Sequence, residues 1–126
     1  MPLVRIDLRR GKPAAYRKAI GDAVYRALRE IFNVPDEDRF MLISEHDEDG
    51  FIYSDRYLDI ARSADLVFIQ LTVSNTRPVE QKQAFFARTV ALLAENPGLR
   101  PQDVFINLVE VVKENWSFGN GIAQYV

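Results

Sequence analysis

Proline stands at position 2, directly after the initiating methionine. Methionine is commonly removed before a small second residue, and the processed chain would then begin with a secondary amine held in a rigid ring. An α-amino group titrates near ~7.7–8.0, and burial or nearby cations lower its pKa toward neutrality. Pro2 is therefore a candidate general base at pH 7, or a cationic acid if its pKa stays high. The alternative is a proline that only starts an edge strand.

The residue types that most catalytic sites use are missing or scarce. The chain has no cysteine and a single histidine, His46, which excludes disulfides, thiolate catalysis and metal sites built from cysteines or several histidines. Serine-nucleophile motifs, glycine-rich phosphate loops and carboxylates at metal-ligand spacing are absent as well. We expect no cofactor and no metal, and we expect His46, which lies in an acidic loop, to be exposed.

The composition is that of one ordinary globular domain. The 126 residues are 48% hydrophobic and 27% charged, with a formal net charge of -2, so no electrostatic attraction to nucleic acid or to an anionic membrane is expected. No apolar run approaches the roughly 20 residues of a membrane span. The start of the chain alternates apolar and charged residues too early for a signal peptide. We expect one cytoplasmic domain, residues 1–126.

The sequence aligns with itself without gaps at a shift of 65 residues. The matched segments are Leu3–Leu8 with Phe68–Val73, Lys12-Pro13 with Arg77-Pro78, and Val34–Phe40 with Leu99–Phe105. Self-similarity at a fixed period indicates duplicated structural units. We place the repeats at about 1–45 and 66–112, with a connector between them and a C-terminal aromatic segment after them. Lys12, the counterpart of Arg77, is expected to lie on the surface without a role.

Each repeat is predicted to form a strand, a helix and a second strand. In the first strand Leu3, Ile6 and Leu8 are apolar whereas Arg5 and Asp7 are polar, which is typical of a sheet with one wet face. A proline stands in the predicted first turn of each helix, where its missing N–H has no intrahelical partner to lose. The predicted elements are strands 3–8 and 39–45 around helix 13–32, and strands 66–73 and 103–112 around helix 78–95.

The connections within each repeat predict how the elements pack. Two strands joined by a helix pair in parallel with a right-handed crossover, so two repeats give an α+β fold with a four-stranded sheet and both helices on one face. We centre the apolar stripe of the second helix on Phe86, Val90 and Leu93. The last strand is an almost unbroken apolar run, VFINLVEVV, which predicts burial on both faces.

The predicted arrangement leaves one face of the sheet uncovered. Because large apolar faces are rarely left in water, we expect another copy of the chain to cover it in a closed homo-oligomer. The residues that we assign to this face are Ile69, Leu71, Val104, Ile106 and Leu108. The acidic connector, about residues 46–63, is expected to be solvated and anchored by its own hydrophobic side chains.

Four stretches of the sequence carry a resemblance to known proteins, namely MPLVRIDL (1–8), VPDEDRF (34–40), RPVEQK (77–82) and NWSFGNG (115–121). Together with Pro2 and the repeat, they resemble the tautomerase superfamily. More narrowly, they are similar to malonate semialdehyde decarboxylase and its tautomerase-like relatives. The resemblance covers essentially the whole chain, and its most specific part is the Trp-Ser-Phe-Gly element. It implies the duplicated β-α-β fold, an enzymatic activity and a homotrimer.

The resemblance also implies roles for particular residues. Pro2 would be the catalytic amine, and Asp38 the carboxylate that orients or activates a water or the proline. Arg77 would bind the substrate carboxylate, and the guanidinium group suits this because it matches a carboxylate bidentately. Trp116 and Phe118 would form a hydrophobic wall.

One position departs from the decarboxylase pattern. Those enzymes carry two arginines spaced two apart before the second helix, and the first of them is Asn75 here. We therefore expect keto–enol proton transfer on a small 2-keto or enol carboxylic acid, with Arg77 and Asn75 binding the acid and Pro2 moving the proton. The alternatives are decarboxylation of a 3-oxo acid such as malonate semialdehyde, or a non-enzymatic interaction protein on the same scaffold.

Each site residue also has a purely structural interpretation. Asp38 could start a turn or strand, and Arg77 could cap a helix start, although a cation there opposes the helix dipole. Trp116 and Phe118 could pack against a neighbouring subunit. The catalytic interpretation requires Pro2, Asp38 and Arg77 to share one pocket. Because Pro2 opens a strand and Arg77 follows one, the second repeat must run antiparallel to the first, or Arg77 must come from another subunit.

Overall fold

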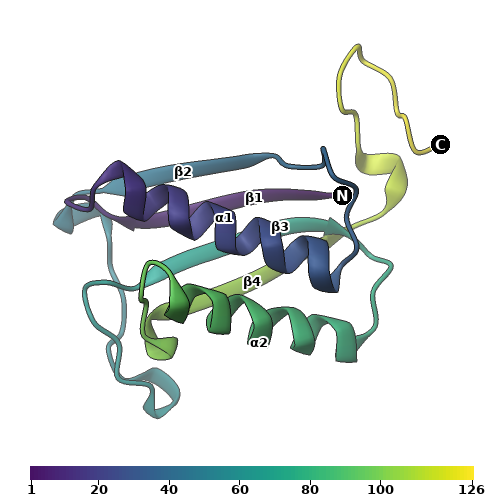
Figure 1. Cartoon of the computed structure of the whole chain (residues 1–126). Coiled ribbons are helices and arrows are strands. Elements are labelled where there is room, and N and C mark those ends of the chain that lie inside the picture. The colour runs from purple at the N-terminus through teal and green to yellow at the C-terminus, as the bar shows by residue number, and fades with distance from the viewer.

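The computed structural model describes all residues, 1–126, and shows a four-stranded sheet with two long helices on one of its faces (Figure 1). In chain order the elements are β1 (Pro2–Arg9), α1 (Ala14–Ile31), β2 (Met41–His46), β3 (Val67–Ser74), α2 (Val79–Glu95) and β4 (Val104–Val111). The predicted α+β fold class is confirmed. Helix boundaries differ slightly from the expected ones, because both prolines stand just before the helices rather than in their first turns.

The strand register repeats between the two halves of the chain. The strand order is β2-β1-β3-β4, and both outer pairs are parallel. Val4 lies opposite Met41, and their counterparts 65 residues later, Ile69 and Ile106, also lie opposite one another. The central pair, β1 and β3, is antiparallel. The duplication inferred from the sequence is therefore present in the hydrogen-bonded register of the sheet.

The hydrophobic core lies between the sheet and the helices. The central strands bury alternate side chains against it, namely Val4, Ile6, Leu8, Val67, Ile69, Leu71 and Val73. The strand period of two places these residues on one face. From α1 the core receives the stripe that runs from Ile20 to Phe32, and from α2 it receives Phe85, Leu92 and Leu93. The stripe of α2 is thus centred on Phe85, one position before the predicted centre at Phe86.

The residues that we assigned to the uncovered face lie on the opposite face, so that prediction is wrong. Ile69 and Leu71 are fully buried beneath the helices, and Val104, Ile106 and Leu108 pack against the same core. The reason is register: β4 pairs with β3 residue for residue, so its core-facing side chains follow those of β3. The open face instead carries the apolar side chains Leu42, Phe68, Phe105 and Val109 among polar ones.

β4 is an edge strand of this sheet, and burial on both of its faces is not found in the single chain. Phe105 is 44% exposed and Val109 is 39% exposed on the open face. Between them, Asn107 accepts a hydrogen bond from the Gln70 side chain at 2.8 Å. The apolar run of this strand therefore leaves a partly hydrophobic surface in the isolated chain.

The connector between the repeats contains two short helices, η1 (Glu48–Gly50) and η2 (Tyr57–Asp59). Phe51 anchors it, being buried with its ring 5.3 Å from that of Phe68. His46 is not freely exposed as expected, because it ends β2 and lies 2.6 Å from Asp7 on the neighbouring strand. No helix of the chain is both long and apolar enough to span a membrane.

The corrected assignment of the sheet faces can be tested at Ile69. Ile69→Ala should lower the free energy of unfolding by about 2–5 kcal/mol, because it removes methyl groups from a fully packed core. The control Gln83→Ala, on the exposed side of α2, should change it by less than about 0.5 kcal/mol. Urea unfolding at one fixed protein concentration measures both. A loss below about 1 kcal/mol for Ile69→Ala would place this side chain outside the core.

Candidate active site

The sheet brings three distant parts of the chain to one end. Pro2 starts β1 and lies opposite Val73, near the end of the antiparallel strand β3. Asp38 lies in the turn before β2, whose start is tied to β1 by a 2.9 Å hydrogen bond from Val4 N–H to the Phe40 carbonyl. Arg77 follows β3 directly. The antiparallel arrangement required for a shared site is thus present within one chain.

Asp38 is a buried carboxylate with unsatisfied hydrogen-bonding capacity. Its side chain is 8% exposed, and Oδ2 lies 3.8 Å from the α-amino group of Met1. Oδ1 is buried and has no hydrogen-bond partner. Burial raises the pKa of Asp38, and the charges of the amino group and of Arg77 oppose that rise. A buried, unpartnered carboxylate oxygen costs free energy, which points to a ligand or proton-transfer role.

The α-amino group is partly removed from water as well. Burial lowers the pKa of the Met1 amine below its ordinary 8.0, the neighbouring Asp38 opposes this, and Arg77 lowers it further. The Met1 side chain is also only 8% exposed, so the first residue of the chain fills the space beside Asp38. An amine at this position is held closer to neutrality than one at a solvated chain end.

Arg77 lies across the end of α1. Its guanidinium carbon is 4.4 Å from the centre of the Phe32 ring, and Nη2 donates to the Phe32 carbonyl at 3.4 Å. Nη1 is buried without a partner. Burial lowers the pKa of Arg77, and Asp38 opposes that shift. The candidate site therefore contains a guanidinium nitrogen and a carboxylate oxygen that both lack partners.

An aromatic cavity of about 220 Å³ lies at the N-terminal end of the chain, and neither Asp38 nor Arg77 is among the residues that line it. It is lined by Met1, Pro2, Leu3, Phe40, Trp116, Ser117 and Phe118. Trp116 and Phe118 stack with ring centres 5.3 Å apart and 15° between their planes. The indole N–H of Trp116 donates to Ser74 Oγ at 3.2 Å, which fixes this wall to the end of β3. The predicted wall residues thus meet Pro2 within one chain.

Asn75 is placed less centrally than the other predicted site residues. It is exposed just after β3, and its backbone N–H donates to the Val111 carbonyl at 3.0 Å. It does not line the aromatic cavity. It lies two residues before Arg77 in the chain.

The sequence reasoning missed Phe40, Ser74 and Tyr125. The ring of Tyr125 packs edge-on against Phe118 at 4.9 Å. Burial raises the pKa of Tyr125, the Asp38 carboxylate adds to the rise and Arg77 opposes it. Its place beside the charged pair depends on the fold of the C-terminal segment, which carries no periodic signal.

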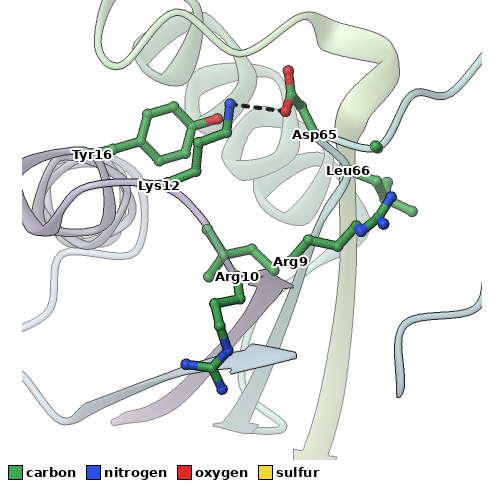
Figure 2. Close-up of a pocket in the computed structure, with 8 residues that line it drawn as sticks. Arg9, Arg10, Lys12, Tyr16, Asp65 and Leu66 are labelled. Atoms are coloured by element: carbon green, nitrogen blue, oxygen red, sulfur yellow. Dashed lines mark ion pairs between the residues drawn. The ribbon is translucent and has the colours of Figure 1, made fainter. Parts of the chain in front are cut away.

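The opposite end of the central strand pair provides an internal comparison. A depression of about 200 Å³ lies there, lined by Leu8, Arg9, Arg10, Lys12, Tyr16, Ala64, Asp65 and Leu66. Figure 2 shows Lys12 directed at Asp65, with Nζ 2.9 Å from Oδ1, and Arg10 turned away from it. Lys12 is the repeat counterpart of Arg77, but it is paired with an acid.

The repeat counterpart of Asp38 is Asp103, and its carboxylate also has partners. Asp103 is fully buried, and it accepts hydrogen bonds at 2.7 Å from both the backbone N–H and the hydroxyl of Ser63. Arg100 adds an ion pair at 3.3 Å. Of the two ends related by duplication, only the end near Pro2 keeps buried side-chain polar atoms without partners.

Comparison with known proteins defines the class. A family model described as tautomerase enzyme matches residues 38–119, and a second model with the same description matches residues 2–59. The chain is 34% identical over 126 residues to the probable tautomerase YusQ of Bacillus subtilis (strain 168), covering 100% of this chain and 99% of that protein. The chain therefore belongs to the tautomerase family.

Among solved structures, the chain is similar to FG41 malonate semialdehyde decarboxylase inhibited by 3-bromopropiolate. The identity is 40% and the TM-score is 0.91, with 98% of this chain and 93% of that chain covered. It also shares its fold with a fused 4-OT wild-type symmetric trimer, at 18% identity and a TM-score of 0.80, with 98% and 97% covered.

The electrostatic coupling in the site predicts how the amine responds to substitution. Asp38→Asn should lower the pKa of the Met1 amine, because the carboxylate stabilises the ammonium form; Arg77→Ala should raise it, because a repelling cation is removed. An NMR titration of the Met1 α-carbon, in protein that retains Met1, measures both shifts. Asp65→Asn, at the other end of the sheet, is the control and should leave the pKa unchanged. Equal pKa values in all four proteins would show that these groups do not interact.

Proposed function

We propose that the chain, after removal of Met1, is a tautomerase in which Pro2 transfers a proton on a small 2-keto or enol carboxylic acid. The observation that carries the proposal is the pair of buried, unpartnered atoms, Asp38 Oδ1 and Arg77 Nη1, together with a partly buried amine 3.8 Å from Asp38 Oδ2. Because the Met1 side chain is buried beside Asp38, its removal would open space for a ligand next to that carboxylate.

Each residue has a proposed role in this reaction. Arg77 binds the substrate carboxylate, with Asn75 as a second donor to the carboxylate or the carbonyl oxygen. Neutral Pro2 accepts the enol hydroxyl proton, and the resulting ammonium returns a proton to carbon, so the amine is regenerated. Asp38 stabilises the transient ammonium. The inhibitor in the similar decarboxylase, 3-bromopropiolate, is itself a small carboxylate, which supports this substrate class.

The aromatic wall supports the same chemistry. Trp116 and Phe118 would exclude water from the reacting atoms, which strengthens each charge contact inside the site. Burial lowers the pKa of the Met1 amine, and the same burial would favour the neutral form of a Pro2 amine in the processed chain.

The second candidate is decarboxylation of a 3-oxo acid such as malonate semialdehyde. It is favoured by the 40% identity to a malonate semialdehyde decarboxylase. In that reaction a protonated Pro2 would polarise the carbonyl, while Arg77 holds the carboxylate out of conjugation. The carbon–carbon bond then breaks to release carbon dioxide, and the resulting enolate takes a proton from Pro2, which regains one from water. The two reactions need opposite charge states of Pro2, so the pKa of the processed amine relative to the working pH separates them.

Activity assays with site variants test the proposal. Native-protein mass spectrometry should show a chain that begins at Pro2, and this protein should convert phenylpyruvate enol to the keto form. Arg77→Ala should lower kcat/KM by about 30- to 5,000-fold, the effect of losing one side of a charged contact worth about 2–5 kcal/mol. Pro2→Ala keeps a primary amine and should retain partial activity, whereas a retained Met1 should abolish it.

The matched control is Lys12→Ala, which removes the repeat counterpart of Arg77 and should leave kcat/KM unchanged. Malonate semialdehyde is assayed in parallel on the same protein. Turnover of that compound alone would favour the decarboxylase. Turnover of neither compound by the processed chain would support a non-enzymatic protein.

We further propose that the chain is a homotrimer in which copies cover the open sheet face. The partly exposed Leu42, Phe105 and Val109 on that face support this, as does the shared fold with a symmetric fused 4-OT trimer. Sedimentation at micromolar concentration should give three times the monomer mass, since burying more than ~1,000 Å² gives a stable interface. Phe105→Asp should dissociate the assembly and Gln83→Asp should not. A wild-type monomer would contradict the proposal.

A further inference from the structure

Arg77 stands where helix electrostatics disfavour a cation. It immediately precedes Pro78, the N-cap of α2, and the N-terminal end of a helix carries positive partial charge. The side chain extends instead to the C-terminal end of α1, which carries negative partial charge. Figure 1 shows that α1 ends and α2 begins at the same end of the molecule, near the N-terminus. The two contacts of Arg77 with Phe32 are made there.

Phe32 is buried and packed closely against its neighbours. Its side chain is 4% exposed, and its ring stacks on Phe85 at 4.6 Å with 22° between the planes. Its backbone N–H donates to the Leu28 carbonyl at 3.0 Å as the C-cap of α1. Asn33 then adopts a positive φ of 54°, which turns the chain away and leaves the Phe32 carbonyl available.

A second contact ties the same two helix ends together. Gln81, in the first turn of α2, donates from Nε2 to the Ile31 carbonyl at 2.7 Å. Two successive carbonyls at the end of α1 therefore accept hydrogen bonds from side chains of the second repeat. The helix–helix interface thus extends to the point where Arg77 enters the site.

We propose that Phe32 is a positioning residue for Arg77. Its ring face and its carbonyl hold one side of the guanidinium, and Nη1 stays unpaired and available to a ligand carboxylate. A free arginine side chain loses considerable rotamer freedom when it binds, so holding it in advance increases affinity. This inference rests on the proposed role of Arg77 in carboxylate binding.

The test compares two neighbouring rings. Phe32→Leu removes the aromatic face beneath Arg77, whereas the matched variant Phe85→Leu breaks the same ring stack without touching Arg77. Phe32→Tyr restores the aromatic face. KM and kcat for phenylpyruvate enol are measured for all three. Relaxation of the Arg77 Nε–Hε group by NMR reports the order of the guanidinium without any substrate.

Phe32→Leu should raise KM by about 2- to 30-fold, the range expected for a partly desolvated cation–π contact, with little change in kcat. Phe85→Leu should change KM less than 2-fold, Phe32→Tyr should restore most of the affinity, and only Phe32→Leu should disorder Arg77. In an Arg77→Ala background, Phe32→Leu should have no further effect on KM.

Three results would overturn the inference. They are an equally ordered Arg77 in wild type and Phe32→Leu, an equal rise of KM in Phe85→Leu, or an undiminished effect of Phe32→Leu in the Arg77→Ala background. If the wild type does not turn over phenylpyruvate, the proposed function fails, and the relaxation data still decide whether Phe32 positions Arg77.

Discussion

The hydrogen bonds between β1 and β3 decide where the polar side chains of this molecule meet. An antiparallel pair places the start of β1 beside the end of β3, so Pro2 and Arg77 reach the same end of the sheet. A parallel pair would separate them by the length of an eight-residue strand, about 25 Å. Asp38 follows from a second constraint: the parallel pairing of β1 and β2 brings the starts of those strands together. The directions of the strands therefore bring Pro2, Asp38 and Arg77 to the same end of the sheet, whatever contacts their side chains make.

That geometry is maintained at a cost in stability. Asp38, Arg77 and the amine are each moved out of water, and burial is the largest cause of the pKa shift of each group. The attraction of Asp38 for the two cationic groups offsets part of this cost, yet Asp38 Oδ1 and Arg77 Nη1 remain without partners. A buried polar group left unpaired costs about 1–3 kcal/mol. Such groups stay unpaired in a chain that otherwise satisfies its buried polar atoms, and a ligand that paired them would gain that free energy.

The sequence was sufficient for the fold class, because prolines and alternating strands are local signals and the 65-residue repeat relates the two halves. The roles of the site residues were taken from the resemblance to the tautomerase superfamily, and they stay predictions. The sequence did not show which face of the sheet the helices cover. Ile69 and Leu71 alternate correctly as strand residues, but alternation alone does not say which face the helices cover. Tyr125 was missed for a related reason, since only the tertiary path of the C-terminal segment brings it to Phe118. The contact of Phe32 with Arg77 joins positions 45 residues apart, so no local pattern in the sequence indicates it.

The second repeat has counterparts of the side chains of the first repeat, but it has no counterpart of the chain's amino terminus. Val67 occupies the place of Pro2 in the second repeat, and its nitrogen is an amide within the chain, so it cannot act as a base. Without an amine, charges held unpaired at that end would only destabilise the fold. At the end of the sheet away from Pro2, the corresponding charged residues both have partners: Asp103 accepts hydrogen bonds from Ser63, and Lys12 forms an ion pair with Asp65. The asymmetry between two ends of one repeated framework therefore supports a proton-transfer site at the end that has the amine.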